Sequence, residues 1–242
     1  MGNLLKTLKN GLKEIDIEIT ESQLENFQLF YRMIKEENKR KNITSIEDEK
    51  EFAIKHFIDS ITCLKAVSFK DGMTLIDIGT GAGFPGIPLK ICRPGIEVIL
   101  VESQAKKVGF LLKVIRDMNL INISAIHTRA EEIGKMPRYR EYCDLVTARA
   151  VAEFRVLAEY CLPVVKIGGF FLAMKGPKLA EELIGIDKTI TILGGKINKI
   201  VNFNLPITGD ERNIVVVEKI KPTPEKYPRR PGIPVKKPIS GE

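Results

Sequence analysis

The stretch Leu75-Ile-Asp-Ile-Gly79-Thr-Gly81-Ala-Gly83-Phe-Pro-Gly86 decides the fold of this chain. An apolar strand runs directly into a glycine-rich turn, and glycines let the backbone bend sharply and approach a ligand closely. A helix that starts after such a turn offers unpaired N–H groups and the positive end of its dipole. The pattern predicts a strand–loop–helix unit that binds a nucleotide-like ligand at the carboxyl end of the strand.

From residue 73 onward, short runs rich in Ile and Val alternate with longer amphipathic segments, as in a parallel sheet covered by helices on both faces. The expected strands are Thr74–Ile78, Glu97–Val101, Ile123–His127, Asp144–Ala148 and Phe170–Met174. The expected helices are Pro88–Arg93, Ala105–Met118, Glu153–Val165 and Pro177–Ile186. Two last strands, Ile197–Leu205 and Arg212–Glu218, have no helix between them and predict an antiparallel finish.

The first seventy residues predict helices. Thr20 and Gln23 have the spacing of a capping box. Apolar residues recur at helical spacing in two sets, Leu24, Phe27, Phe30, Tyr31, Ile34 and then Phe52, Ile54, Phe57, Ile58, Ile61. The polar run Lys39-Arg40-Lys41-Asn42 between them predicts a loop. We expect three parts, a helical region 1–70 packed on the core, a sheet-containing core 71–220 and a tail 221–242.

The composition is that of a folded soluble protein. The chain has 242 residues, 44% of them hydrophobic and 29% charged, which excludes wholesale disorder. It has no run of 18 apolar residues and no export signal at its start, so we expect no membrane contact and a cytoplasmic location. Its four cysteines are scattered and its histidines number two, so buried thiols and no metal site are expected.

The net charge of +7 is unevenly distributed. Residues 1–70 are neutral overall, residues 71–220 carry +3, and the tail 221–242 carries +4 with six of the thirteen prolines. Proline fixes the backbone and removes hydrogen-bond donors, which argues against helix or central strand. The tail is therefore predicted to be an extended basic strap, either a solubilising end or a segment that lies along phosphates.

Three acidic positions distinguish the possible ligands. The spacing from Gly81 to Gly86 satisfies a dinucleotide fingerprint, but Asp77 inside the first strand would repel a pyrophosphate. Glu102 ends the second strand, where a carboxylate accepts hydrogen bonds from ribose hydroxyls, a role that indicates a nucleoside but suits either ligand. The pair Ala130-Glu131 follows the third strand, where it could hold an adenine edge. Together these positions favour S-adenosylmethionine over a dinucleotide.

Basic residues follow several strands of the predicted sheet. Because the carboxyl ends of parallel strands meet at one edge, these residues should form a basic rim beside the nucleoside pocket. They are Lys106, Lys107, Arg129, Arg149 and Lys175. Such a rim predicts a polyanionic substrate.

Beyond the glycine loop, two segments carry a family resemblance, Cys143-Asp-Leu-Val-Thr-Ala-Arg-Ala-Val-Ala152 and Tyr227-Pro-Arg-Arg-Pro-Gly-Ile-Pro234. Asn42-Ile-Thr44 and His56-Phe-Ile-Asp-Ser60 also fit. With these motifs the chain resembles the RsmG family, also called glucose-inhibited division protein B, from about residue 20 to residue 239. The resemblance implies a class I, Rossmann-like methyltransferase fold and transfer of a methyl group from S-adenosylmethionine to N7 of one guanine in small-subunit ribosomal RNA.

The resemblance also implies ligand contacts. The matching positions are Gly79, Phe84, Ala130, Glu131 and Arg149. We add Asp77, Gly81, Gly83 and Glu102 from the expected loop geometry. For RNA we expect the rim residues Lys106, Lys107, Arg129 and Lys175 and the tail residues Arg229, Arg230, Lys236 and Lys237. Naked RNA and an assembling 30S particle are both open as substrate, and a monomer is the default expectation.

Guanine N7 carries no proton, so its methylation needs orientation within the site and no general base. The sequence agrees, because it has neither an N-P-P-Y-type motif nor a Pro-Cys nucleophile. Arg149 is the candidate that orients the reactants rather than an acid or base. Two alternative functions remain open beside methyl transfer, a dinucleotide-dependent oxidoreductase and a non-enzymatic RNA- or ribosome-binding protein.

Overall fold

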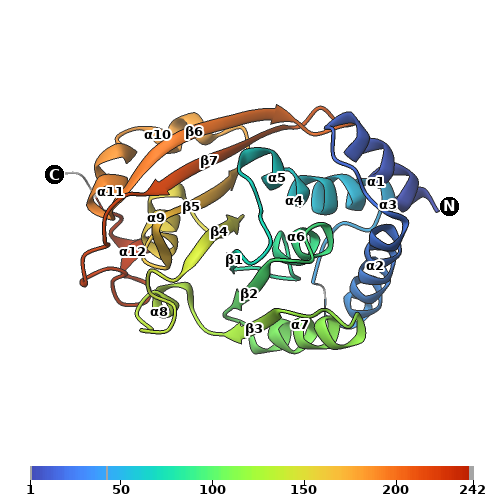
Figure 1. The fold of residues 1–242 in the computed structure, drawn as a ribbon, viewed down its shortest axis with the longest axis horizontal. Coiled ribbons are helices and arrows are strands. Elements are labelled where there is room, and N and C mark those ends of the chain that lie inside the picture. The colour runs from blue at the N-terminus through green and yellow to red at the C-terminus, as the bar shows by residue number, and fades with distance from the viewer. Residues whose placement is uncertain (1, 42, 240–242) are drawn as a thin grey trace.

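The computed structural model describes residues 2–41 and 43–239. Within them a seven-stranded sheet has the order β3-β2-β1-β4-β5-β7-β6 (Figure 1). Its strands are β1 Thr74–Ile78, β2 Glu97–Glu102, β3 Ile123–His127, β4 Cys143–Arg149, β5 Val165–Lys175, β6 Gly195–Asn204 and β7 Glu211–Lys219. Strands β1 to β5 pair in parallel, whereas β7 is antiparallel to β5 and to β6. The predicted Rossmann-like α/β class with an antiparallel finish is confirmed.

Helices cover both faces of this sheet. Before it come α1 Asn3–Glu14, α2 Glu21–Lys41, α3 Glu49–Phe52, the π-helix η1 Ala53–Ile58, α4 Asp59–Ile61 and α5 Cys63–Ala66. Within the sheet region lie α6 Gly86–Cys92, α7 Ala105–Asp117, α8 Ala130–Ile133, α9 Phe154–Cys161, α10 Leu179–Leu183 and α11 Ile186–Ile192. A last helical turn, α12 Ile233–Lys236, lies in the tail. Figure 1 shows the N-terminal helices and the tail on opposite sides of the molecule.

Alternating residues of each central strand enter two separate apolar clusters. Leu75 of β1 and Val216 of β7 join the cluster built with α1, α2, η1, α6 and α7. Ile76 and Val217 join the cluster built with α9, α11 and the tail. Successive strand residues point to opposite faces, so both faces of the sheet are buried. This explains why the strands are apolar runs without polar alternation.

The N-terminal helices pack on the sheet through the expected apolar stripes. The capping box at the start of α2 is confirmed, because the Gln23 amide donates to Thr20 Oγ1 at 3.2 Å and the Thr20 amide donates to Gln23 Oε1 at 2.9 Å. The prediction of a loop at residues 39–42 is wrong for residues 39–41, which continue α2 to Lys41. Asn42 lies outside the described residues. All four cysteines are buried and free, as predicted.

Several expected boundaries differ from the structure. The helix expected over residues 153–165 ends at Cys161, and Val165 already begins β5. The helix expected over residues 177–186 is shorter, spanning only Leu179–Leu183 (α10), and Gly185 at φ 67° separates it from α11. A left-handed glycine ends one helix and turns the chain into the next. α8 and α11 were not expected from the sequence.

The tail is bound to the core rather than extended away from it. Arg140 donates to the carbonyls of Gly134 and Tyr227 at 2.9 Å and of Thr223 at 2.7 Å. The Thr223 amide donates to Glu141 Oε1 at 2.7 Å. The expectation that the tail forms no helix is wrong for α12, because Pro234 stands in its first turn, where an N–H needs no helical partner.

Candidate active site

The carboxyl ends of β1 and β4 lie side by side where the strand order reverses. The chain proceeds from β1 to β2 and β3 on one side of the sheet and then returns to β4 on the other. At such a switch point the loops after neighbouring strands diverge and leave a crevice, which is the usual ligand site of this fold class. The glycine loop follows β1, and the segment after Arg149 follows β4.

Gly79 is a loop position that requires glycine. Its φ is 69°, and a Cβ atom there would lie 2.5 Å from Cγ2 of Val151. The glycine therefore allows the loop after β4 to pack directly on the loop after β1. Gly81 and Gly83 also have positive φ values, of 61° and 104°. All three predicted glycines thus belong to one tight turn at the crevice.

Asp77 of β1 accepts hydrogen bonds that hold the glycine loop in place. Its fully buried carboxylate accepts hydrogen bonds from Thr80 Oγ1 at 2.6 Å, from the Gly86 amide at 2.8 Å and from Thr147 Oγ1 at 3.3 Å. Burial raises the pKa of Asp77 to about 6, and the hydrogen bonds from Thr80 and Gly86 oppose that rise. The carboxylate thus supports the turn, which is the loop-amide role that the sequence predicts for an acid at this position.

Glu102 lies at the end of β2 beside the same loop. Its Oε2 accepts from the Gly81 amide at 3.0 Å, and its Oε1 accepts from the Gln104 amide at 2.8 Å. These contacts fix a carboxylate at the place where the sequence predicts a ribose acceptor. They also connect the loop after β1 to the start of α7, so β2 and the glycine loop form one unit.

A cavity of about 490 Å³ adjoins the glycine loop. Its volume falls in the usual range of small-molecule sites, about 300–1,000 Å³. Four of the predicted residues, Gly79, Arg129, Ala130 and Glu131, are in its wall. The wall also contains residues that were not expected from the sequence, Val101, Ser103, Gln104, Thr128, Val151, Ala152, Tyr160 and Val235. Ser103, Gln104 and Thr128 directly follow predicted strands and so could have been expected, whereas nothing local marks Tyr160 or Val235.

Glu131 connects this cavity to the tail. Its Oε1 accepts from the Gly232 amide at 3.0 Å and from the Tyr160 hydroxyl at 3.3 Å. Burial, with the adjacent Glu131 carboxylate, raises the pKa of Tyr160, so its hydroxyl stays protonated as the donor. Val235 of α12 completes the wall. The tail is therefore part of the cavity.

Arg229 was expected to bind RNA, but the structure pairs it with Glu159. Its Nη2 lies 2.6 Å from Glu159 Oε2, and its Nε lies 2.9 Å from Glu159 Oε1. A guanidinium held by two bonds to a buried carboxylate is an anchor for the chain rather than an exposed phosphate contact. Arg230, Lys236 and Lys237 are exposed beside it.

Phe84 lies in an aromatic cluster and does not line the 490 Å³ cavity. Its ring stacks on His56 with centroids 4.7 Å apart and contacts Phe52 and Phe57. The Arg149 guanidinium carbon lies 5.2 Å from the Phe84 ring centroid. Thus Phe84 joins the glycine loop to η1 and supports Arg149 from one side.

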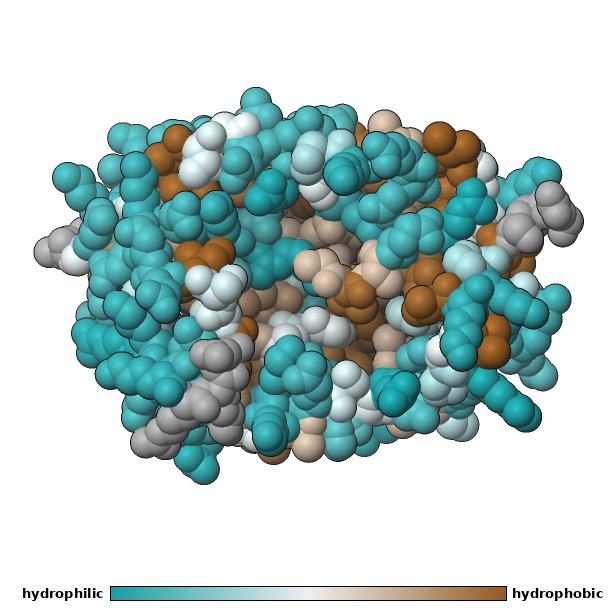
Figure 2. Space-filling view, turned by 180° about the vertical axis from the view of Figure 1, so that it is seen from behind, coloured by the Kyte–Doolittle hydropathy of each residue, from teal (hydrophilic) through white to brown (hydrophobic). Residues whose placement is uncertain are grey.

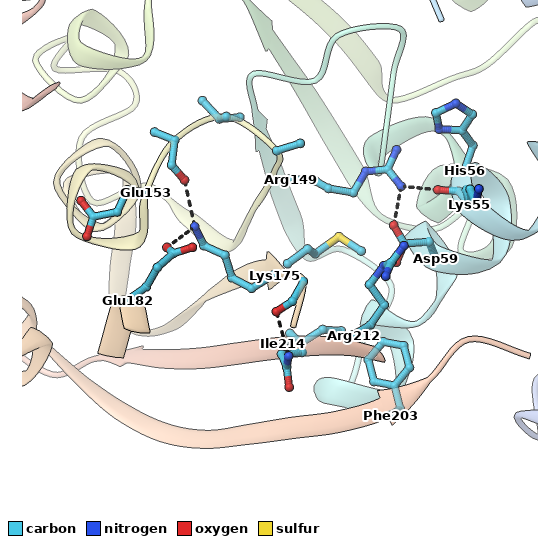
Figure 3. Close-up of a pocket in the computed structure, with 16 residues that line it drawn as sticks. Lys55, His56, Asp59, Arg149, Glu153, Lys175, Glu182, Phe203, Arg212 and Ile214 are labelled. Atoms are coloured by element: carbon cyan, nitrogen blue, oxygen red, sulfur yellow. Dashed lines mark hydrogen bonds and ion pairs between the residues drawn. The ribbon is translucent and has the colours of Figure 1, made fainter. Parts of the chain in front are cut away.

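Arg149 faces a second, larger cavity of about 810 Å³ (Figure 3). Its Nη1 donates to Asp59 Oδ2 at 2.8 Å and to the Lys55 carbonyl at 3.2 Å. Arg212 Nε lies 3.2 Å from the other oxygen of Asp59. Asp59 is thereby held between two guanidinium groups from different parts of the chain.

His56 lines this second cavity as a neutral ring. Its Nε2 lies 2.9 Å from Thr44 Oγ1, and burial followed by the charge of Arg149 lowers its pKa to about 3. The wall also contains Phe203, Arg212 and Asn213, which the sequence analysis did not single out. They come from β6 and β7, far from the glycine loop in sequence. The two cavities share Val151 and Ala152.

The basic rim is only partly as expected. Lys106 and Arg129 are exposed and Lys107 is half-buried. Lys175 is instead mostly buried, because its Nζ donates to the Ala152 carbonyl at 2.8 Å and to Glu182 Oε2 at 2.6 Å. It lines the larger cavity and is not an exposed rim charge. Seen from behind, the mostly hydrophilic surface has a hollow near its middle where more apolar residues show (Figure 2).

Across residues 2–41 and 43–239 no helix is both long and apolar enough to span a bilayer. In the same residues no group of three or more His, Cys, Asp or Glu side chains is placed to hold a metal ion.

Known proteins resemble this chain over nearly its full length. The model of the family "GidB: rRNA small subunit methyltransferase G" matches residues 23–215. The ribosomal RNA small subunit methyltransferase G of Pelotomaculum thermopropionicum is 55% identical over 239 residues, 99% of this chain and 100% of that protein. The protein of the same name from Bacillus subtilis is 47% identical, over 98% of this chain and 99% of its own length.

Among solved structures, a SAM-dependent methyltransferase from Aquifex aeolicus has the same fold, with a TM-score of 0.55 and 19% identity over 74% of this chain and 97% of that one. These findings give no support to an oxidoreductase or to a non-enzymatic RNA-binding protein. With a matching family model and full-length relatives at 47–55% identity, the chain belongs to the ribosomal RNA small subunit methyltransferase G family.

Proposed function

We propose that this protein transfers a methyl group from S-adenosylmethionine to N7 of a guanine in small-subunit ribosomal RNA. The proposal rests on two neighbouring cavities that share Val151 and Ala152 in their walls. One lies beside the glycine loop, and the other is lined with charged side chains. A nucleoside cofactor in the first and an RNA nucleotide in the second would lie on either side of these two residues. The relatives are named for small-subunit ribosomal RNA, which supplies the substrate class.

The residues around the smaller cavity suit an adenosyl ligand. The turn at Gly79 brings backbone close to the cavity, and Ala130 and Glu131 form the wall where the adenine edge would lie. Glu102 places a carboxylate at the end of β2 for the ribose hydroxyls. Gly81 and Gly83 shape the loop, and Asp77 supports it through the Gly86 amide.

The bound cofactor would supply a sulfonium methyl group, which the N7 lone pair takes as the S–C bond breaks, leaving S-adenosylhomocysteine and a cationic 7-methylguanine. No side chain has to remove a proton, because N7 carries none. The neutral His56 and the Arg149 guanidinium in the larger cavity are compatible with that requirement. The protein's contribution is orientation, which is worth up to about 7–11 kcal/mol in favourable intramolecular reactions.

Arg149 is proposed as the main orienting residue. Its guanidinium is fixed by Asp59 and by the Phe84 ring, and it lies at the end of β4 where the two cavities approach each other. A fixed guanidinium suits a cofactor carboxylate or the guanine O6, which are both acceptors. It cannot donate to N7 in a reactive complex, because that lone pair must stay free.

Phosphate contacts are proposed for the basic residues at the surface around the site. These are the exposed Lys106 and Arg129 and the half-buried Lys107 on the rim, and the exposed Arg230, Lys236 and Lys237 on the tail. Such contacts position RNA without reading its sequence. The deep major groove of A-form RNA hides N7, so the target guanine should lie in a loop or a distorted region. A free RNA and an assembling 30S particle both meet this requirement.

Methyl transfer with labelled S-adenosylmethionine tests the proposal, using small-subunit ribosomal RNA and 30S particles as substrates. The expected product is 7-methylguanine at one position. RNA with 7-deazaguanosine at that position, which has C–H in place of N7, should accept no methyl group. Labelling elsewhere than guanine N7, or no labelling of either substrate, would overturn the proposal. Calorimetry with S-adenosylhomocysteine separates an inactive enzyme from a protein that binds RNA alone.

A further inference from the structure

The larger cavity contains a carboxylate whose position is fixed by one of its two oxygens. Glu182 Oε2 accepts from Lys175 Nζ and from the Phe154 amide, both at 2.6 Å. Its Oε1 accepts no hydrogen bond from the described residues and belongs to a half-buried side chain in the cavity wall. The side chain is thereby held in one orientation with an acceptor that stays available to a ligand. Figure 3 shows Lys175 and Glu182 together on one side of the cavity, across from Arg149 and Asp59.

Lys175 and Glu182 present a cation beside a carboxylate. Guanine presents the complementary order on its Watson–Crick edge, with the acceptor O6 followed by the donors N1–H and N2–H₂. Adenine presents a donor amino group followed by an acceptor nitrogen, which would meet like groups at both places. The pair therefore fits guanine and rejects adenine.

We propose that the 810 Å³ cavity receives the target guanine and that Lys175 and Glu182 read its Watson–Crick edge. Lys175 Nζ donates to O6, and Glu182 Oε1 accepts from N1–H and N2–H₂. This inference rests on the proposed function and names the recognition residues of the same site.

The position of the pair also places the reacting atom. Lys175 Nζ is bonded to the carbonyl of Ala152, and Ala152 is in the wall of both cavities. O6 and N7 lie side by side on the Hoogsteen edge of guanine. A guanine whose O6 is held at Lys175 therefore keeps N7 close to the wall that faces the cofactor cavity, as methyl transfer requires.

The cavity contains two further carboxylates that could compete for this role. Asp59 Oδ2 is bonded to Arg149. Its Oδ1 accepts no hydrogen bond from the described residues, but it is buried 3.2 Å from Arg212 Nε, so a base would first have to displace that cation. Glu153 caps α9 through the Arg155 amide. Glu153 is held by this single hydrogen bond of 3.4 Å, whereas Glu182 is fixed by two donors at 2.6 Å and keeps its second oxygen open to a ligand.

Replacement of the mapped target guanosine by inosine, which lacks only the 2-amino group, tests the contact in the wild-type protein. A lost hydrogen bond to a carboxylate predicts a decrease of about tenfold in kcat/KM. Equal rates on guanosine and inosine RNA would overturn the proposal. If guanosine RNA itself gains no methyl group at N7, the proposed function fails instead.

The variants Glu182→Gln and Glu182→Ala locate the contact. We expect kcat/KM on guanosine RNA to fall at least tenfold, and the guanosine-to-inosine ratio to fall from about tenfold to threefold or less. A purely structural role would lower both rates equally and leave the ratio at its wild-type value, which overturns the proposal. Glu153→Gln is the matched control and should keep the ratio at about tenfold. A loss of the ratio in Asp59→Asn with its retention in Glu182→Gln would assign the reading to Asp59.

Discussion

Arg229 and Glu159 form a bidentate ion pair, with Nη2 2.6 Å from Oε2 and Nε 2.9 Å from Oε1, and the Glu159 side chain is 1% exposed. The Arg229 amide donates to the same carboxylate at 2.8 Å. Three residues farther on, the Gly232 amide donates to Glu131 in the wall of the 490 Å³ cavity. The pair therefore fixes the tail segment that completes the cavity wall.

Arg229→Ala should weaken S-adenosylhomocysteine binding about tenfold, because the tail loses its anchor and Glu131 its partner. It should also lower the free energy of unfolding by about 2 kcal/mol, less than the 3–5 kcal/mol typical of a fully buried pair, because Arg229 is partly exposed. Calorimetry and urea unfolding measure the two effects. The neighbouring Arg230→Ala is the control and should leave both unchanged, so equal behaviour of the two variants would contradict this role for Arg229.

Gly79→Ala should abolish cofactor binding, since its Cβ would lie 2.5 Å from Val151 Cγ2 at a φ of 69°. Gly72→Ala is the matched control, with φ 82° and no atom within 4 Å of its Cβ. Both changes place a side chain in the left-handed region, which costs about 1–2 kcal/mol. Unfolding should therefore show a penalty in both, while calorimetry with S-adenosylhomocysteine should show lost binding in Gly79→Ala alone. Lost binding in both variants would mean that backbone strain, not the contact with Val151, is responsible.

The strands were predictable because each one is a short apolar run bounded by turn residues. Thr74–Ile78 has the predicted limits, since burial on both faces leaves a continuous apolar signal. The edge strand Ile123–His127 also has the predicted limits, although its residues are only partly buried. The helices α8 and α11 were missed, because short helices held by tertiary contacts carry little periodicity of their own. Propensity likewise failed at α12, where packing on the core outweighs the prolines.

The cofactor side of the site was more predictable than the substrate side. Gly79 directly follows β1, and Ala130 and Glu131 lie in the short segment after β3, so topology alone brings them together. Asp59 reaches Arg149 across 90 residues, and Arg229 reaches Glu159 across 70. Composition assigned Arg229 and Lys175 to a basic surface, but their charges are taken up by Glu159 and Glu182. Charge pairing of this kind depends on long-range packing, which residue counts do not contain.

Acid should destabilise the protein through His56. Its pKa is about 3 in the folded protein against an ordinary 6.5, so the unfolded chain binds more protons between these values. The contribution of His56 to the free energy of unfolding is then fully present above about pH 6.5. It is lost as the pH falls, by about 2 kcal/mol between pH 7.5 and pH 5. In His56→Gln, the decrease in the free energy of unfolding between pH 7.5 and pH 5 should be smaller than in the wild type by that amount. The buried Asp77 titrates equally in both proteins, so it does not contribute to the difference. Urea unfolding at the two pH values measures it. His127→Gln, on exposed β3, should keep the wild-type loss, and an unchanged loss in His56→Gln would contradict the assignment.

The exposed charges of the tail should act on RNA and not on the cofactor. Arg230, Lys236 and Lys237 are exposed beside the cavity wall. Their joint replacement by Ala should weaken binding of small-subunit RNA and reduce the slope of log K against log salt by about 2, if each contacts one phosphate of single-stranded RNA. Affinity for S-adenosylhomocysteine should stay unchanged, in contrast to Arg229→Ala. Titrations of RNA binding at several salt concentrations measure the slope, and a slope equal to that of the wild type would show that the tail charges serve solubility instead.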